Sequence, residues 1–252
     1  MKKSCLKIHP LTIFFLFIAF ITGYFKYIIY FMSLIFIHEL GHVTAALLFN
    51  WNIKKIIILP FGGMTIFEEL VNCPIKEEFF IVLMGPIYQH LLYLLLCFLG
   101  YNTPLLTTIH SFILGFNLLP IYPLDGSKLV LLFLEKCFSF YQSQILITLF
   151  SLLTLFLAFL FPYSFLFYIL VFFLLYQVVL FYKKIPFLFH KFVLERKLYV
   201  FSFRKRKQIQ CIKQMKRDYE HYFIKEGYVY SEKEYLSLKW NNSQNFTIEK
   251  EK

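Results

Sequence analysis

Two histidines and a glutamate stand close together in the segment Ile37–His42, in the order His38, Glu39 and His42. Histidines at positions i and i+4 lie on the same face of a helix, where one ring nitrogen of each can reach the same metal ion. Glu39 directly follows the first histidine and can take the proton of a water molecule held at that metal. The spacing therefore predicts a metal centre, with His38 and His42 as ligands and Glu39 as general base.

This segment lies inside a continuous apolar run from Tyr27 to Phe49, in which Glu39 is the first charged residue. Ionisable side chains are costly in the hydrocarbon of a membrane, so their presence in such a run indicates a functional site. A chance occurrence of the pattern is the alternative, and the position within an apolar run argues against it.

A third metal ligand has to come from elsewhere in the chain, because a catalytic zinc takes three protein ligands and keeps one open position. Asp125 is the strongest candidate, since it follows an apolar span and lies between prolines and a glycine. Such a segment interrupts a helix, and irregular backbone at membrane depth is tolerated only where protein or a watery cavity surrounds it. His38 lies about 17 Å along its helix from Tyr27, the outer end of a span that runs inward. Asp125 follows another span that runs inward. Both His38 and Asp125 are therefore expected in the cytosolic half of the membrane.

Other ionisable residues near the apolar runs have simpler explanations. The acidic pairs Glu68–Glu69 and Glu77–Glu78 lie near the start of a run and are expected to be solvated. His90 and His110 lie within apolar runs, where a hydrogen bond to a neighbouring helix is favoured over metal binding.

The composition is that of a multispanning membrane protein: 59% of the residues are hydrophobic and 21% are aromatic, more apolar surface than a water-soluble fold needs. We expect an all-α polytopic membrane protein with about six transmembrane helices, a short β-hairpin-like segment near the active site and a small cytosolic C-terminal α/β tail. The expected spans are about 10–25, 27–49, 78–100, 104–120, 143–161 and 163–182. Residues 1–190 are predicted to form the membrane domain and residues 191–252 the basic tail.

The distribution of basic residues predicts the orientation in the membrane. Lys2, Lys3 and Lys7 precede the first span, and most of the net charge of +11 lies beyond Lys183. Because basic loops stay on the cytosolic side, both termini are predicted to be cytosolic. The five cysteines contain no C-x-x-C pair, and disulfides are not expected.

Two further segments are candidates for substrate binding. Residues 53–67 are rich in β-branched side chains around Pro60 and the pair Gly62 and Gly63, which predicts two short extended pieces around a turn. A strand edge there, with Gly62 and Gly63, could pair with a substrate backbone; an interfacial loop that only packs on the bundle is the alternative. Asn117 could hold the substrate backbone or an oxyanion, or could serve helix packing instead, and the same choice applies to Gln89.

The tail carries the basic cluster Arg204–Lys207. Basic clusters next to a membrane contact anionic lipid, and we favour this interpretation over a nucleic-acid site, so that no nucleic acid is expected as a partner. Within the tail, a helix is predicted over Ile209–Tyr219 and a hairpin over Tyr222–Tyr230.

Taken in order, these motifs resemble those of the site-2 intramembrane zinc metalloproteases, peptidase family M50, and within it the stage IV sporulation protein FB type. The resemblance covers about residues 7–200. The segments that carry it are Ile37–His42, Leu59–Gly63, Pro74–Phe79, Met84–Pro86 with Gln89 and His90, Asn117–Gly126 and Phe192–Arg196.

The resemblance implies one Zn²⁺ per chain, bound by His38, His42 and Asp125, with Glu39 as general base in the cleavage of a peptide bond at or near the membrane. It also implies a pro-sigma factor of sporulation as substrate, inhibitory membrane proteins as partners, and a place in the mother cell at the outer forespore membrane. Relatives of this type end in a nucleotide-sensing domain like that of cystathionine β-synthase. Only about 55 residues follow Arg196 here, so the tail is predicted to hold a single reduced motif.

Three alternatives remain at this point. A catalytically silent membrane regulator of the same fold is the first, although the intact Glu39 argues against it. A site-2 protease that acts on a different membrane-associated substrate is the second. A metal transporter is the third, and the repeated halves with broken helices that are typical of transporters are not evident in this sequence.

Overall fold

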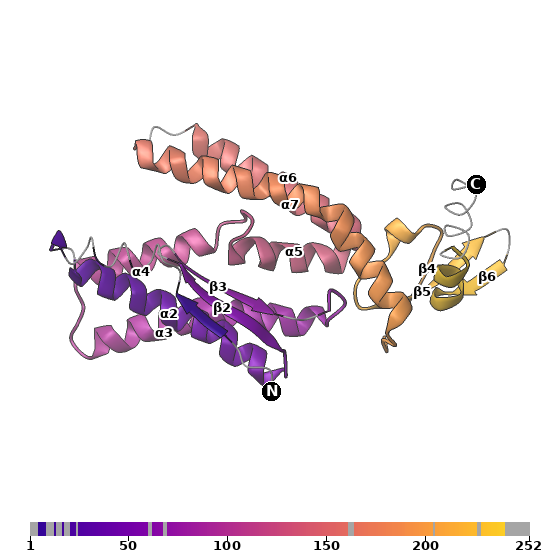
Figure 1. Cartoon of the computed structure of the whole chain (residues 1–252), viewed down its shortest axis with the longest axis horizontal. Coiled ribbons are helices and arrows are strands. Elements are labelled where there is room, and N and C mark those ends of the chain that lie inside the picture. The colour runs from indigo at the N-terminus through magenta and orange to yellow at the C-terminus, as the bar shows by residue number, and fades with distance from the viewer. Residues whose placement is uncertain are drawn as a thin grey trace. The chain divides into compact units, whose positions relative to one another are not determined.

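The computed structural model describes residues 5–8, 13, 17, 21–23, 25–59, 62–67, 70–160, 164–203, 205–225 and 228–239. The described chain forms two compact units (Figure 1). The first consists of Met1–Glu69, Lys76–Pro120 and Leu124–Leu129, and the second of Leu70–Ile75, Ile121–Pro123 and Val130–Lys252. The predicted domain boundary at residue 190 falls within a helix that continues to Leu198, and the proposed division stays a prediction.

Four of the described helices are long and apolar enough to cross a membrane. They are α2 (Phe25–Leu48), α3 (Ile75–Phe98), α6 (Phe140–Phe159) and the stretch Phe167–Leu198 of α7 (Phe165–Leu198). The chain is therefore a multi-pass helical membrane protein, as its composition predicts. The expected span 104–120 contains α4 (Pro104–Asn117), which has 14 residues. A helix of this length extends for about 21 Å, which is shorter than the hydrocarbon core of a membrane, about 30 Å. The expected span 10–25 lies for the most part outside the described residues.

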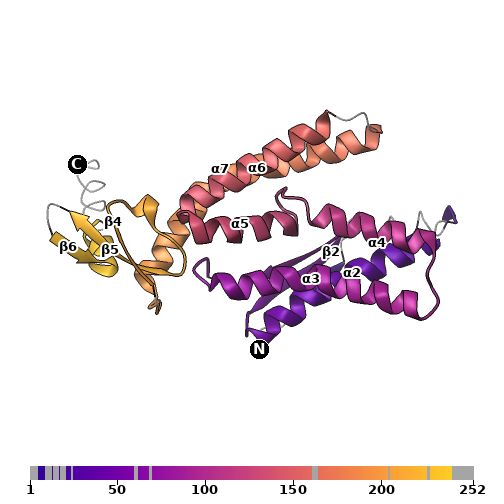
Figure 2. The same ribbon diagram turned by 180° about the vertical axis from the view of Figure 1, so that it is seen from behind.

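The helices α2, α3 and α4 form the helical part of the first unit (Figure 2). Leu34 and Ile35 of α2 are buried in one hydrophobic cluster with Leu106 and Ile113 of α4. Between α2 and α3 the contact is closer still, since a Cβ atom added to Gly41 would lie 2.3 Å from the backbone oxygen of Met84. A glycine is thus required where the histidine-bearing helix meets α3.

A three-stranded sheet completes the first unit. The strands β2 (Ile53–Leu59) and β3 (Gly62–Phe67) pair in antiparallel fashion, with Leu59 opposite Gly62. This confirms the two extended pieces that the β-branched residues predicted. The strand β1 (Cys5–Ile8) adds to β2 in parallel, a pairing that the short segment did not predict. In the order β1-β2-β3, the strand β3 lies at one edge of this sheet, and it contacts α2.

The second unit contains α6 and α7, which run side by side as an antiparallel pair (Figures 1 and 2). Helix α6 begins with a capping box in which Ser139 and Gln142 exchange hydrogen bonds. Phe140 of α6 stacks on Phe192 of α7, with ring centroids 4.4 Å apart. Preceding this pair is α5 (Asp125–Cys137), whose first turn belongs to the first unit.

A second three-stranded sheet, β4 (Lys205–Ile209), β5 (Tyr219–Lys225) and β6 (Tyr228–Ser231), follows α7. The predicted hairpin is confirmed, since Ile224 pairs with Val229 in antiparallel strands. By contrast, the helix predicted over Ile209–Tyr219 is wrong: this segment ends β4, forms one 3₁₀ turn, η1 (Ile212–Gln214), and starts β5. Both Ile209 and Met215 are buried in one core, and residues six apart lie on different faces of a helix, so a helix could not bury both.

An ion pair is buried in this second unit. The guanidinium of Arg217 donates to the carboxylate of Glu135 at 2.8 Å, and both side chains are almost fully buried. The same guanidinium donates to the backbone oxygen of Cys73 at 3.0 Å. Since charged groups inside a protein are stable only when paired, these contacts tie the segment before α3 to the end of α5 and the C-terminal sheet.

The substitution Arg217→Met is therefore expected to lower the free energy of unfolding by about 3–5 kcal/mol, because it leaves the Glu135 carboxylate buried without its partner. Arg206→Met is the matched control, since the Arg206–Glu220 pair at 3.0 Å is exposed and is expected to contribute about 1 kcal/mol or less. Denaturant unfolding in detergent micelles, followed by near-UV circular dichroism, measures both changes. Equal losses in the two variants would contradict the assignment.

Candidate metal centre

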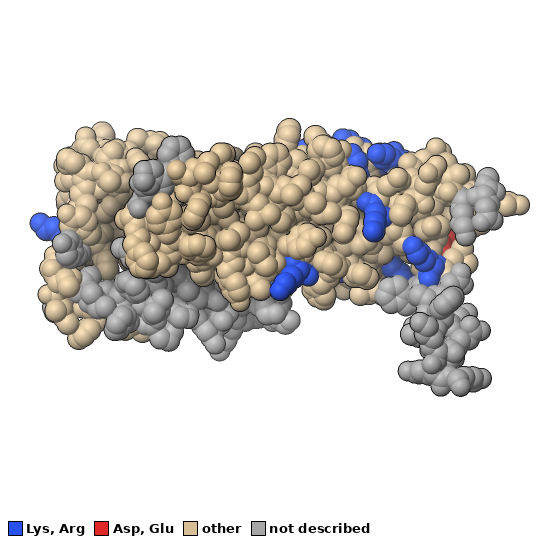
Figure 3. All heavy atoms as spheres, turned by 90° about the horizontal axis from the view of Figure 1, so that it is seen from above, with Lys and Arg blue, Asp and Glu red and all other residues tan. Residues whose placement is uncertain are grey.

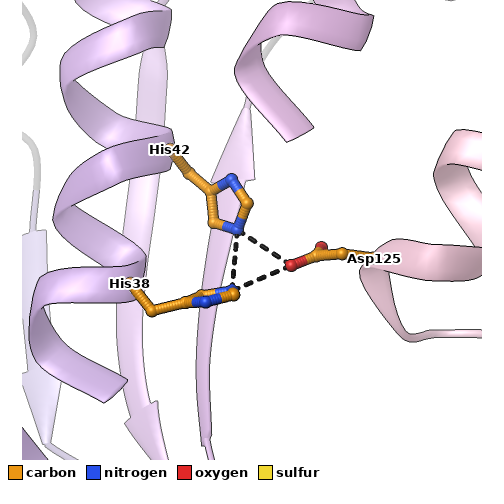
Figure 4. A group of neighbouring side chains, drawn as sticks. All are labelled: His38, His42 and Asp125. Carbon is orange, nitrogen blue, oxygen red and sulfur yellow. Dashed lines mark hydrogen bonds and ion pairs between the residues drawn. The ribbon is translucent and has the colours of Figure 1, made fainter. Parts of the chain in front are cut away.

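The three predicted ligands lie together in the first unit (Figure 4). His38 and His42 lie one turn apart on α2, and Asp125 is the first residue of α5. Oδ2 of Asp125 is 2.9 Å from Nε2 of His38 and 3.0 Å from Nε2 of His42. The two Nε2 atoms are 3.1 Å apart, and all three residues are buried. These residues form a possible metal-binding site.

The other ring nitrogen of each histidine determines which tautomer is present. Nδ1 of His42 is 2.8 Å from the backbone oxygen of Ile81, which can only accept a hydrogen bond. Nδ1 of His38 is 3.1 Å from Oε1 of Gln89, which is likewise an acceptor. Both Nδ1 atoms therefore carry the proton, and both Nε2 atoms present a lone pair to the centre.

Three electron-pair donors thus face one another, two imidazole nitrogens and one carboxylate oxygen. A metal ion at their centre would accept an electron pair from each of the three atoms. Two imidazoles and one carboxylate are a donor set that suits a divalent transition metal, and three protein ligands leave a position open for a reactant. The residues fit a bound metal ion.

Asp125 is held in place by the start of α5. A Cβ atom added to the next residue, Gly126, would lie 2.1 Å from the backbone oxygen of Leu118, so only glycine allows α5 to begin so close to the end of α4. Oδ1 of Asp125 accepts from the ammonium of Lys128 at 2.9 Å, while Oδ2 faces the histidines. Burial alone would raise the pKa of the Asp125 carboxyl, but Lys128 and the imidazoles lower this pKa well below its usual range. The carboxylate is therefore ionised, as a metal ligand must be.

A chain of hydrogen bonds supports His38 from α3 and α4. Gln89 of α3 is fully buried; its oxygen accepts from His38, and its NH₂ group donates to the backbone oxygen of His110 at 3.2 Å. Nδ1 of His110 is 3.3 Å from the same amide nitrogen, and Nε2 of His110 is 3.2 Å from Nδ1 of His90. The predicted interhelical hydrogen bonds of His90 and His110 are thus present, and they fix the orientation of the Gln89 amide.

Gly85 of α3 lies directly against the two imidazoles. A Cβ atom there would be 2.3 Å from Nε2 of His42 and 2.9 Å from Nε2 of His38. Any side chain at this position would occupy the space in front of the metal-facing nitrogens. The close approach at Gly85, together with that at Gly41, explains why two glycines lie where α2 and α3 meet.

The remaining predicted site residues lie as follows. Glu39 of α2 is half-buried and close enough to His42 and Lys128 to act on their charges. Asn117 is the last residue of α4, and none of the hydrogen bonds of the three ligands involves it. Gly62 and Gly63 begin β3. The substrate-binding roles of these last three residues stay predictions.

Two supporting residues escaped the sequence analysis. The sequence analysis gives no role to Lys128, although its position three residues after Asp125 on a helix places it beside that carboxylate. Gly85 was noted only as part of a motif. Its contact with the imidazoles depends on the packing of α2 against α3, which no local pattern specifies.

The fold and the site define a multi-pass membrane protein with a metal-binding centre buried among its helices. Residues 26–105 match the sequence model of peptidase family M50, a stretch that includes His38, Glu39, His42, Gly85 and Gln89. Over this stretch the chain is similar to peptidase family M50.

The chain is also similar to individual proteins over part of its length. The chain is 36% identical over 148 residues to stage IV sporulation protein FB of Bacillus subtilis, a match that covers 54% of this chain and 50% of the relative. It is 31% identical over 129 residues to a zinc metalloprotease of Methanocaldococcus jannaschii, which covers 46% of this chain and 36% of the relative. The matches thus span half or less of these curated relatives. A solved structure, the site-2 protease from M. jannaschii, superposes with a TM-score of 0.48 at 20% identity and covers 80% of this chain and 95% of that one.

The substitution Gln89→Leu is expected to weaken metal binding by about 10- to 100-fold, because it removes the acceptor that orients His38. Gln89→Glu is the control, since its carboxylate oxygen still accepts from Nδ1 of His38 and should keep the affinity near that of the wild type. Competition with a zinc chelator, on the purified full chain, measures the dissociation constants. If the leucine variant binds zinc as tightly as the wild type, the orienting role of Gln89 is wrong.

The substitution Gly85→Ala is expected to abolish tight metal binding while the chain stays folded, because the new methyl group displaces the imidazoles. Gly115→Ala on α4 is the control, since an added Cβ there meets nothing within 4 Å, and alanine stabilises a helix by about 0.5–1 kcal/mol over glycine. Zinc content and the melting temperature separate the two effects. An alanine variant at position 85 that retains one zinc per chain would contradict the close approach.

Proposed function

We propose that this chain is an intramembrane zinc metalloprotease that cleaves a peptide bond at or near the membrane, with one Zn²⁺ per chain. The observation that carries the proposal is the convergence of His38, His42 and Asp125, each with its second polar atom held by a neighbouring residue. Zinc is favoured because two imidazoles and one carboxylate are a ligand set of catalytic zinc sites, and because the archaeal relative is a zinc metalloprotease.

In the proposed mechanism the chain supplies a general base and the residues that orient the three ligands. When bound, zinc would supply Lewis-acid chemistry, which polarises a peptide carbonyl and makes water more nucleophilic at neutral pH. Glu39 accepts the proton of the attacking water and returns it to the leaving amine. Ile81 and Gln89 hold the imidazoles in the tautomer that leaves Nε2 unprotonated, and Lys128 keeps the Asp125 carboxylate ionised and oriented.

The strand β3 is the proposed binding place for the substrate backbone. It is an edge strand of its sheet and contacts α2, the helix that carries Glu39. An extended peptide that adds to a sheet edge has its backbone fixed by main-chain hydrogen bonds. Gly62 and Gly63 at the start of β3 would allow a close approach of that backbone, and Asn117 is proposed to stabilise the developing oxyanion.

For the biological setting, we propose six spans with both termini in the cytosol, the basic tail on anionic lipid, and a pro-sigma factor of sporulation as substrate. The relative from B. subtilis, a stage IV sporulation protein, supports the sporulation setting. Membrane-protein inhibitors are the proposed regulators, and the mother cell at the outer forespore membrane is the proposed location.

Co-expression with a candidate pro-sigma factor tests the proposal. The wild type is expected to produce a shortened product, whereas Glu39→Gln should lower the cleavage rate by about 10²–10⁴-fold and still bind zinc. Asp125→Asn should lose both cleavage and tight zinc binding. Cleavage by the Glu39→Gln variant at the wild-type rate would contradict the assigned base, and undiminished zinc content in Asp125→Asn would contradict the assigned ligand.

A further inference from the structure

A cavity of about 300 Å³ lies in the second unit, where the loop between α5 and α6 meets β4 and η1. Its polar lining residues are Ser139, Gln142, Lys207, Gln208, Gln214 and Lys216. None of these residues takes part in the metal centre, which belongs to the other unit. The cavity therefore needs a separate explanation.

Two lysines meet at this cavity, Lys207 from β4 and Lys216 from the segment after η1. Burial lowers the pKa of Lys216, and the neighbouring Lys207 ammonium lowers it further, which shows that the two charges act on each other. The Lys216 ammonium donates to the backbone oxygen of Cys137, which holds it at the cavity.

Acidic residues near the cavity are paired elsewhere. Glu220 pairs with Arg206, and Glu135 pairs with Arg217. Within the described ranges, no carboxylate forms an ion pair with Lys207 or Lys216. Two like charges thus converge on a polar cavity without a counter-charge from the described part of the chain.

Two glutamines of the lining have their side-chain oxygen engaged. Oε1 of Gln142 accepts from the backbone N–H of Ser139, and Oε1 of Gln214 accepts from the backbone N–H of Gln210. Within the described residues, these bonds engage the oxygen of each glutamine and not its NH₂ group. Ser139 and Gln142 also form the first turn of α6, where the helix dipole adds a partial positive charge. The cavity therefore offers two ammonium groups and two amide groups, and its positive charge favours an anion.

We propose that this cavity binds the phosphate group of a small phosphate ester. Phosphate carries a charge of about −1.5 to −2 near pH 7 and three acceptor oxygens, which matches two lysines and several donors better than a carboxylate does. The ester is either the headgroup of a membrane lipid or a soluble molecule, because the same phosphate chemistry serves both.

The surface around the cavity is basic. Lys205 and Arg206 precede Lys207 on β4, and all three side chains are exposed. On the face drawn in Figure 3, several Lys and Arg side chains are visible and acidic side chains are almost absent. Such a surface attracts phosphate esters from solution and anionic lipids alike.

Site-resolved lysine acetylation, read by mass spectrometry on the full chain in phosphatidylcholine nanodiscs, tests the proposal. Inorganic pyrophosphate is the soluble probe, and nanodiscs that contain phosphatidic acid are the lipid probe. At a probe concentration ten times Kd, the acetylation rates of Lys207 and Lys216 should fall about tenfold, whereas that of the exposed Lys233 should not change. Protection by pyrophosphate identifies a soluble ester, and protection by phosphatidic acid alone identifies a lipid headgroup.

Two variants keep the test decisive. Lys216→Gln should abolish the protection of Lys207, and Lys207→Gln should abolish that of Lys216. Lys213→Gln should preserve both, because Lys213 lies over the ring of Tyr141 and not in the cavity. The proposal is overturned if neither probe protects the two lysines, if Lys233 is protected equally, or if protection persists in both cavity variants. The assay reads lysine reactivity and not cleavage, so its failure is distinguishable from a failure of the proposed protease function.

Discussion

The structure of the first unit depends on one electrostatic constraint: two imidazole nitrogens and a carboxylate oxygen meet within about 3 Å of one another. Such a cluster needs a positive charge at its centre, which a metal ion provides for all three atoms at once. The neighbouring residues all maintain this arrangement. Ile81 and Gln89 take the protons of the imidazoles to the far side of each ring, and Lys128 compensates the charge of the carboxylate.

Close helix packing is the second requirement of the same centre. Ligands that are more than 80 positions apart in the chain can meet only if α2, α3 and the start of α5 approach one another without intervening side chains. Glycine provides that space at three points, Gly41, Gly85 and Gly126. In a membrane, where helices associate by packing and hydrogen bonds and not by expulsion of water, small residues and interhelical bonds such as Gln89–His110 are what hold such a bundle together.

The sequence predicts the three residues that converge in the structure, because their chemistry is unusual for their surroundings. His38, His42 and Asp125 stand out as polar groups within or beside apolar runs, and helical periodicity places the histidines on one face. The long helices and the β2–β3 hairpin follow from hydropathy and from β-branched residues. The supporting shell was harder to predict, since the partners of Gln89 and the contact of Gly85 depend on tertiary packing. The helix expected over Ile209–Tyr219 failed for the same reason, because the burial of both Ile209 and Met215 in one core overrides local propensity.

X-ray absorption spectroscopy of the purified full chain tests the metal and its ligands most directly. We expect one zinc per chain with nitrogen and oxygen ligands only, at about 2.0–2.2 Å, with the multiple-scattering signal of two imidazoles. A sulfur shell at about 2.3 Å, which would point to cysteine ligation, or a spectrum without two imidazoles, would contradict the centre formed by His38, His42 and Asp125.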